Sequence, residues 1–239
     1  MMKKIKSALI SVSDKSNLKP LLQILKKNKV KIISSGGTFK TIKRLKFDCS
    51  EVSDFTGFKE ILGGRVKTLH PKIHAGILNK RNNKLHQKQL KSNKFENIDL
   101  VIVNFYPFEK TLKKTKKHEK ILENIDIGGP TMVRASAKNY NDVTVITSIK
   151  QYPELIDQLK MNKGSTSLKF RKNMSQLAFG ETAYYDSVIS NYFNVDSKTY
   201  FPQKKIIYGN LIEKLRYGEN PHQMSALYSE NTSLKINKI

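Results

Sequence analysis

The feature that most constrains the fold is an alternation of short apolar runs with segments of helical periodicity. The apolar runs cover residues 5–12, 30–34, 98–104 and 143–147, and helical spacing of apolar residues marks 17–29 and 152–159. Nearly uninterrupted apolar runs are typical of strands that are covered on both faces. Their alternation with helices favours a parallel sheet. The sequence therefore predicts an α/β fold with a doubly wound parallel sheet.

After residue 167 the pattern becomes helical. One apolar stripe contains Met174, Leu177, Ala178, Tyr185, Val188, Ile189 and Tyr192. It predicts a long amphipathic helix over residues 168–193 that closes the domain. The stripe ends after Asp196, and Pro202 and Gly209 interrupt the remainder, which predicts an irregular tail. We expect one domain over residues 1–199, followed by a linker and tail over 200–239.

The charge of the chain allows two interpretations. Its 239 residues include 44 Lys and Arg against 20 Asp and Glu, a formal net charge of +24. Such an excess can indicate a polyanionic partner such as RNA or DNA. However, the lysines follow no single helix face and no nucleic-acid-binding motif is visible. We therefore expect no specific nucleic-acid partner, although a phosphorylated small substrate would benefit from the positive field.

Apolar segments and cysteine usage limit the compartment. No apolar run approaches the roughly 18–20 residues that a membrane span needs, and residues 8–12 fit a buried strand better than a secretory signal. The single cysteine, Cys49, can form no internal disulfide and has no nearby His or Cys to share a zinc ion. These observations predict a cytoplasmic protein with no membrane contact and no metal site.

Two polar loops follow the first two predicted strands. Ligands of parallel sheets bind at the carboxyl ends of strands, where loops lead into helix N-termini. Residues 11–15 (SVSDK) and 35–38 (SGGT) occupy such places. Paired glycines let backbone N–H groups approach an anion, and the hydroxyls add donors. SGGT alone fits a tight turn equally well, so the two loops together only favour a phosphate site.

Two further segments combine polar groups that could carry chemistry. Residues 63–71 (GGRVKTLHP), with His74 beyond them, place Arg, Lys and His in one turn-rich stretch, which could also be a solvated basic loop. Residues 104–108 (NFYPF) follow the most apolar strand. Asp126 precedes a predicted helix that extends to Lys138. A helix cap for Asp126 and a solvent-exposed position for Lys138 are the alternatives to a functional role.

The motifs SVSDK, SGGT, GGRVKTLHPKIHAGIL, NFYPF, DIGGPTMVRASAKN and LRYGENPHQ together resemble the IMP cyclohydrolase domain of the bifunctional purine-biosynthesis family. Their order and spacing fit from residue 7 to about 223. The resemblance implies a methylglyoxal-synthase-like fold and closure of the six-membered ring of formyl-AICAR, giving IMP and water. It also implies a homodimer, a purine ribonucleotide substrate and no cofactor for this reaction.

The resemblance carries residue roles onto this chain. It implies a catalytic set of Lys67, Tyr106, Asp126 and Lys138. Lys67 would exchange protons, Tyr106 would donate to the formyl oxygen or relay a proton, and Asp126 and Lys138 would orient the carboxamide. The residues expected to bind the substrate are Ser11, Ser13, Asp14, Lys15, Ser35, Gly36, Gly37, Thr38, Arg65, Thr68, His70, Gly76, Ile77, Asn104, Gly128 and Gly129.

The segment LRYGENPHQ resembles the opening of the family's transformylase domain, whose formyl donor is 10-formyltetrahydrofolate. Because the sequence stops at Ile239, before that domain's Lys–His pair could appear, we expect no transformylase activity from this chain. Two other possibilities remain besides a nucleic-acid-binding protein. One is an inactive remnant of the bifunctional enzyme, and the other is a methylglyoxal-synthase-like lyase or ligand-binding domain.

Overall fold

The computed structural model describes residues 1–229, and the chain divides into two compact units. The first covers residues 1–182, and the second begins at residue 183. The helix α10 (Leu168–Asp196) runs from the first unit into the second without interruption. The boundary between residues 199 and 200 stays a prediction about where one functional domain ends.

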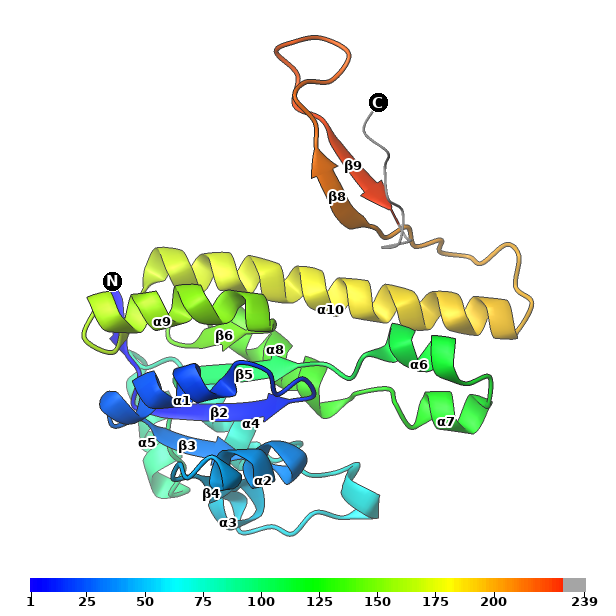
Figure 1. The fold of residues 1–239 in the computed structure, drawn as a ribbon. Coiled ribbons are helices and arrows are strands. Elements are labelled where there is room, and N and C mark those ends of the chain that lie inside the picture. Colours follow the sequence, from blue (N-terminus) through cyan, green and yellow to red (C-terminus); the bar gives the residue numbers. More distant parts are fainter. Residues whose placement is uncertain (230–239) are drawn as a thin grey trace. The chain divides into compact units, whose positions relative to one another are not determined.

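A five-stranded parallel sheet forms the centre of the first unit (Figure 1). In spatial order its strands are β4 (Ser50–Glu51), β3 (Lys31–Ser34), β2 (Ser7–Val12), β5 (Leu100–Asn104) and β6 (Thr144–Ile146). The chain therefore starts in the middle of the sheet, builds one side and then the other. This reversal of strand order beside β2 creates the crevice where ligands of open α/β sheets bind.

The predicted strands are strands because their side chains are buried on both faces. Ala8, Leu9 and Ile10 of β2 are fully buried, as are Leu100 and Val101 of β5. Removing such side chains from water contributes roughly 1.5–3 kcal/mol for each large one. The predicted runs at 5–12, 30–34, 98–104 and 143–147 each contain one strand of the sheet, so this part of the prediction is confirmed.

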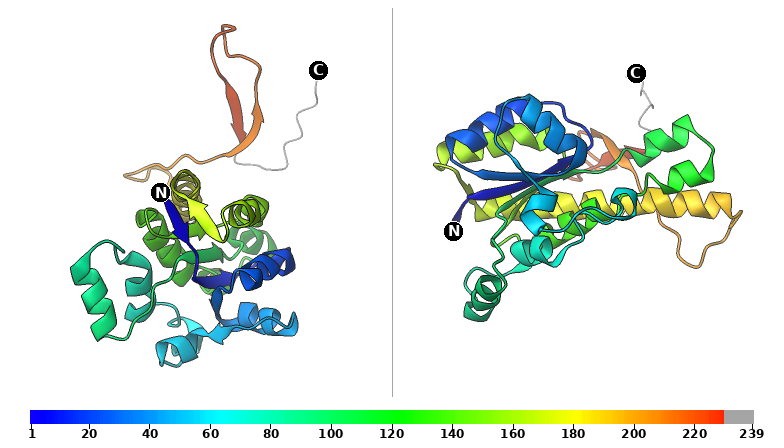
Figure 2. Two further views of the ribbon diagram at one scale, coloured as in Figure 1. Left: turned by 90° about the vertical axis from the view of Figure 1, so that its left-hand side faces the viewer. Right: turned by 90° about the horizontal axis from the view of Figure 1, so that it is seen from below.

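Helices cover both faces of the sheet. Some crossovers run from β2 toward β4, and others run in the opposite direction, toward β6. Because each crossover is right-handed, the two groups place their helices on opposite faces of the sheet. Accordingly α1 (Leu18–Lys27) packs with α9 (Tyr152–Met161), and α4 (Pro71–Leu78) packs with α8 (Gly128–Lys138) (Figure 2). The remaining helices of this unit are α2 (Gly36–Arg44), α3 (Val52–Thr56), α5 (Lys84–Ser92), α6 (Phe108–Lys114), α7 (His118–Leu122), and the 3-10 turns at Leu62–Gly64 and Ile149–Gln151.

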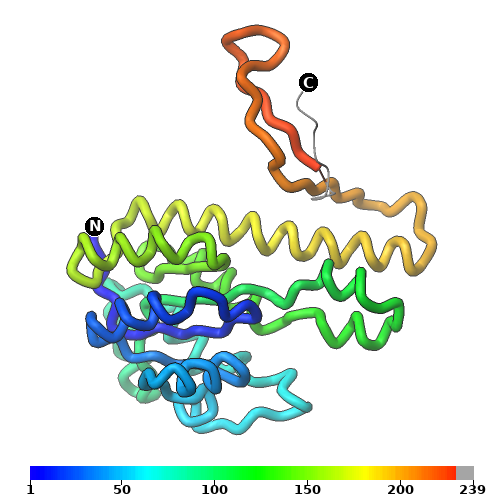
Figure 3. Tube along the Cα trace, viewed as in Figure 1, coloured from blue at the N-terminus to red at the C-terminus, as the bar shows by residue number. Residues whose placement is uncertain are grey.

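The sequence pattern did not predict several short elements. The strands β1 (Met2–Lys4) and β7 (Ser165–Ser167) pair antiparallel outside the main sheet. The helices α6 and α7 lie in the lysine-rich segment between β5 and α8, which leaves the sheet and returns to it (Figure 3). These elements contain three to seven residues each, too few to establish a hydrophobic period.

The predicted irregular tail is present at residues 197–209 and 215–225, but a pair of strands that the sequence did not predict interrupts it. After α10, β8 (Asn210–Lys214) and β9 (Ala226–Ser229) form an antiparallel pair with a bulge between Leu211 and Glu213. Burial is slight along both strands, so the alternation that reveals a half-buried strand is absent from the sequence. In residues 1–229 no helix is long and apolar enough to cross a membrane.

Candidate functional site

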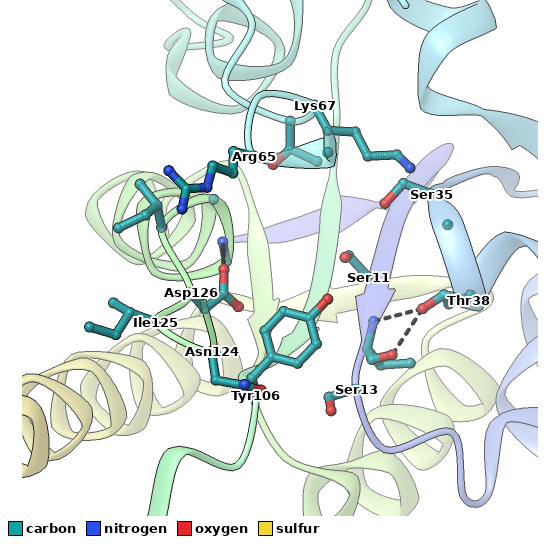
Figure 4. Close-up of a pocket in the computed structure, with 18 of the residues that line it drawn as sticks. Ser11, Ser13, Ser35, Thr38, Arg65, Lys67, Tyr106, Asn124, Ile125 and Asp126 are labelled. Atoms are coloured by element: carbon teal, nitrogen blue, oxygen red, sulfur yellow. Dashed lines mark hydrogen bonds between the residues drawn. The ribbon is translucent and has the colours of Figure 1, made fainter. Parts of the chain in front are cut away.

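A pocket of about 940 Å³ opens at the carboxyl ends of the central strands. Its walls come from the ends of β2, β3 and β5, the first turns of α2 and α8, and the loop that carries Lys67 (Figure 4). Fifteen predicted site residues line it: Ser11, Ser13, Lys15, Ser35, Gly36, Gly37, Thr38, Arg65, Lys67, Thr68, Asn104, Tyr106, Asp126, Gly128 and Gly129. Segments spread over 119 positions of the chain thus meet in one place.

The first turn of α2 has the properties of an anion site. Ser35 precedes the helix but makes no side-chain capping bond, and the first turn contains no acidic residue. Within residues 1–229, the N–H groups of this first turn therefore have no side-chain acceptor, and the helix dipole is positive at this end. Gly36 has a φ of 53°, in the left-handed region that glycine tolerates. This geometry suits a phosphate group.

Two lysine side chains approach the same helix end from different loops. A β-carbon on Gly36 would lie 3.5 Å from Lys67 Nζ, and one on Gly37 would lie 3.7 Å from Lys15 Nζ. Lys15 Nζ also donates a hydrogen bond of 3.0 Å to the Ser13 carbonyl. The two ammonium groups add positive charge to that of the helix end. The α2 N-terminus and the two ammonium groups would therefore all attract a doubly charged phosphate at this point.

Two predicted substrate contacts serve instead as framework in this structure. The Thr38 hydroxyl accepts from Val12 N at 3.0 Å and donates to the Val12 carbonyl at 2.9 Å, so it ties α2 to the end of β2. Asn104 Oδ1 accepts from Ser13 N at 2.6 Å and from Asp14 N at 2.9 Å, and Asn104 Nδ2 donates to the Asp14 carbonyl at 3.1 Å. Both side chains fix the loop that carries Lys15.

The second wall is built around the start of α8. Asp126 Oδ1 accepts a 2.8 Å hydrogen bond from Gly129 N, so the carboxyl group folds over the first turn of the helix. A β-carbon on Gly129 would approach Asp126 to well within contact distance, and one on Gly128 would lie 2.5 Å from the Thr68 hydroxyl. The double glycine therefore lets both side chains pack against the helix start.

Asp126 combines the helix-cap and site interpretations that the sequence left open. Burial raises the pKa of its carboxyl group above the ordinary value, and the hydrogen bond from Gly129 opposes that rise. A carboxyl group with a raised pKa exchanges its proton more readily near neutral pH, which suits acid–base chemistry. Asp126 thus caps the helix and also lines the pocket as a titratable group.

Tyr106 follows β5 and is 54% exposed. Its side chain extends into the pocket, with Asp126 on one side and Ser11 and Ser13 across from it (Figure 4). Because the phenol is held at the rim while its hydroxyl faces the open space, it can reach a bound molecule without a large conformational change.

Two cations of the pocket are engaged with acidic residues that no sequence motif indicates. Lys67 forms an ion pair with Glu60, and Arg65 forms one with Glu123. Both acids line the pocket. Sequence motifs do not indicate these two residues, because acidic side chains are not expected beside an anion site. Only the structure reveals them: Glu60 faces Lys67 across a turn, and Glu123 faces Arg65 from the residue that follows α7.

Five predicted residues do not line the pocket: Asp14, His70, Gly76, Ile77 and Lys138. His70 caps α4, where its Nδ1 accepts from Lys72 N at 3.1 Å. Gly76 and Ile77 are buried within α4. A β-carbon on Gly76 would lie 2.6 Å from the carbonyl oxygen of Glu96, so this glycine permits close packing.

Asp14 and Lys138 lie elsewhere. Asp14 is exposed and its Oδ1 accepts a 2.8 Å hydrogen bond from Ser16 N, which lowers the pKa of the carboxyl group. Lys138 is exposed in the last turn of α8, about 15 Å along the axis from Gly128. A single chain therefore does not bring Lys138 to Asp126, and a catalytic role for Lys138 stays a prediction. In residues 1–229 no cluster of three or more His, Cys, Asp or Glu side chains could hold a metal ion.

Comparisons with known proteins place this pocket in a family context. The family described as an MGS-like domain matches residues 17–131, and the family described as AICARFT/IMPCHase bienzyme matches residues 136–239. The chain is 45% identical over 227 residues to the "Bifunctional purine biosynthesis protein PurH" of Bradyrhizobium diazoefficiens, covering 95% of this chain and 43% of that protein.

Two further comparisons agree with it. The PurH protein of Persephonella marina is 50% identical, with 93% of this chain and 44% of that protein covered. The crystal structure of ForH is similar with a TM-score of 0.70 and 26% identity, covering 79% of this chain and 99% of ForH. The chain spans less than half the length of the PurH relatives it matches. Over the part of those proteins that it spans, the chain belongs to the PurH family of bifunctional purine biosynthesis proteins.

Proposed function

We propose that this chain closes the ring of formyl-AICAR to give IMP and water, at the pocket between α2 and α8. The observation that carries the proposal is the pairing of two different walls in one pocket. One wall is a helix N-terminus with Lys15 beside it, suited to a 5′-phosphate, and the Lys67 ammonium lies at the edge of this wall within the same pocket. The other presents the carboxyl group of Asp126 and the phenol of Tyr106, suited to proton transfer.

The reaction needs positioning and charge stabilisation more than a cofactor. The carboxamide nitrogen attacks the formyl carbon, a C–N bond forms, and the formyl oxygen takes up charge before it leaves as water. Anchoring the phosphate at α2 would restrict the substrate so that its two reacting groups meet inside the pocket, which removes much of the entropic barrier. Backbone N–H groups, Lys15 and Ser35 would hold the phosphate, and the framework bonds of Thr38 and Asn104 would keep that site in place.

The proton movements fall to the second wall. Asp126 would take the proton from the carboxamide nitrogen, since its raised pKa makes it a better base than an ordinary carboxylate. Tyr106 would donate to the formyl oxygen, and the Lys67 ammonium would stabilise the developing negative charge. For water to leave, the former formyl oxygen needs a second proton and the formylated nitrogen loses its own. Asp126, now protonated, would donate the former and the Tyr106 phenolate would accept the latter as the C–O bond breaks, so both groups return to their starting states.

The test is ring closure by the purified chain on synthetic formyl-AICAR, followed as IMP formation. Lys67→Ala and Asp126→Asn should each lower kcat by about 100-fold or more. Lys91→Ala in α5 and Asp157→Asn in α9 are matched controls outside the pocket and should leave kcat unchanged. Near-normal turnover by both site variants would show that the site assignment is wrong. A folded wild-type chain without turnover would refute the function itself.

A second candidate has one observation in its favour, the match of residues 17–131 to the MGS-like domain. The pocket at the α2 N-terminus would also accept a triose phosphate. Methylglyoxal formation from such a substrate, without ring closure of formyl-AICAR, would favour this lyase function. If neither reaction occurs but IMP binds, an inactive remnant is the better description. The expected homodimer is tested separately by the mass of the chain in solution.

A further inference from the structure

The ion pair between Glu60 and Lys67 closes the base of a small loop that faces the pocket. Residues 61 and 66 form an isolated antiparallel bridge, with Ile61 N donating to the Val66 carbonyl at 3.2 Å. Glu60 and Lys67 are the next residues outward on each side. In antiparallel pairing these two residues lie opposite one another, so their side chains leave on the same face of the loop.

The surroundings of Lys67 make such a partner necessary if the ammonium group is to stay in one place. A lysine side chain has four rotatable bonds, and its charge is repelled by other cations and by the positive end of a helix. Lys67 Nζ nevertheless lies 3.5 Å from where a β-carbon of Gly36 would be, near the start of α2. Glu60 supplies a negative charge at this point. The pKa of Glu60 is lowered, first by its hydrogen bond to Lys67, so the Glu60 carboxyl group is charged at neutral pH.

The two partners differ in exposure. The Lys67 side chain is 20% exposed and that of Glu60 is 53% exposed. The Lys67 side chain is therefore the more shielded of the two, although both residues line the pocket. An exposed ion pair has little effect on stability, so the consequence of this pair concerns the position of Lys67 and not the fold.

We propose that Glu60 is a positioning residue that holds the Lys67 ammonium beside the start of α2, ready for the bound substrate. The proposal rests on the proposed function, because it takes Lys67 to act on the reacting molecule. It adds a residue that the motifs did not assign, and it gives an acid at the edge of an anion pocket a definite purpose.

The kinetic test compares Glu60→Gln and Glu60→Asp with the control Glu96→Gln. Glu96 also pairs with a lysine, at 2.8 Å from Lys31 Nζ, and it does not line this pocket. Its side chain is 54% exposed against 53% for Glu60, which makes it a suitable control. Glu60→Gln should lower kcat by about tenfold or more, because displacing a catalytic group by about 1 Å can cost up to 100-fold. KM should change by less than about twofold, because the proposal has Lys67 act in the transition state and not in binding of the ground state.

The conservative variant separates positioning from a structural role. Glu60→Asp keeps the charge and should recover part of the lost kcat, whereas the unfolding midpoint should be the same in all variants. Glu96→Gln should keep wild-type kcat. The proposal is overturned if kcat of Glu60→Gln stays within about twofold of wild type, or if Glu96→Gln lowers kcat as much as Glu60→Gln does.

A second readout does not depend on any enzymatic activity. Trace acylation by acetic anhydride, read by mass spectrometry at each lysine, reports how well an amine is held in an ion pair. Glu60→Gln should raise acylation of Lys67 by roughly two- to fivefold and leave Lys31 unchanged. Glu96→Gln should raise acylation of Lys31 and leave that of Lys67 unchanged.

The two readouts distinguish the possible failures. Unchanged acylation of Lys67 in Glu60→Gln overturns the positioning proposal, whatever the activity of the wild type. A wild-type chain that lacks ring closure but shows the acylation response overturns the proposed function and the catalytic purpose of the pair, while the contact itself stands.

Discussion

Asn104→Ala should weaken nucleotide binding although the Asn104 side chain need not touch the nucleotide. The variant removes three hydrogen bonds to the loop after β2, at 2.6, 2.9 and 3.1 Å. Each such bond contributes about 1 kcal/mol net, so the three together contribute about 3 kcal/mol. Two of the three bonds are exposed, so water can replace them in the variant. We therefore expect a net loss of about half of these 3 kcal/mol, which is the cost of ordering the loop without Asn104.

In Asn104→Ala this cost lowers the affinity for the nucleotide, because binding of the phosphate has to order Ser13 and Lys15, which Asn104 holds in place in the wild type. A cost of about 1.4 kcal/mol corresponds to a tenfold change in Kd. Titration calorimetry with IMP should therefore show affinity about tenfold weaker than wild type, with a smaller change in the unfolding midpoint. The control is Asn93→Ala, which removes one 2.8 Å bond to the Gln89 carbonyl at the end of α5. An Asn104→Ala chain that binds IMP as tightly as wild type would refute this reasoning.

Three further predictions concern packing and pH. Gly76→Ala should lower the free energy of unfolding by about 3 kcal/mol in urea titration, since the new β-carbon would lie 2.6 Å from a backbone oxygen. Gly180→Ala in α10, with nothing within 4 Å, should instead raise it by up to about 1 kcal/mol, and equal effects would contradict the packing argument. Arg171→Leu should cost about 3–5 kcal/mol, because the buried guanidinium donates to the carbonyls of Tyr140, Thr166 and Asn141, whereas the exposed neighbour Lys172→Ala should be nearly neutral. Burial raises the pKa of Asp126 above 3.8, so the native state keeps this proton to higher pH than the unfolded chain does. The wild-type unfolding free energy should therefore fall as pH rises from about 4 through the raised pKa, and Asp126→Asn should abolish this part of the pH dependence. The same slope in both proteins would show that the carboxyl group is not perturbed.

The sequence by itself determined the elements that depend on local pattern. The apolar runs of β2 and β5 leave no polar face, so each strand had to be covered on both sides, and the parallel sheet followed. Because SVSDK, SGGT and the Asn104 segment each lie at the end of a parallel strand, they had to meet at the carboxyl edge of the sheet. The long motifs identified the family because each combines several residues at fixed spacing, which no periodicity argument could supply.

Only the tertiary structure decided which side chains share the pocket and what each contacts there. Gly76 and Gly129 look alike in the sequence, yet one allows a helix to pack against a backbone oxygen and the other lets a carboxyl group fold over a helix start. Lys67 and Lys138 were predicted together, but a helix of eleven residues carries Lys138 away from Asp126. Glu60 gave no signal at all, because its partner is fixed by a turn between them. Distances across loops depend on how the chain turns, and a linear pattern contains no measure of that.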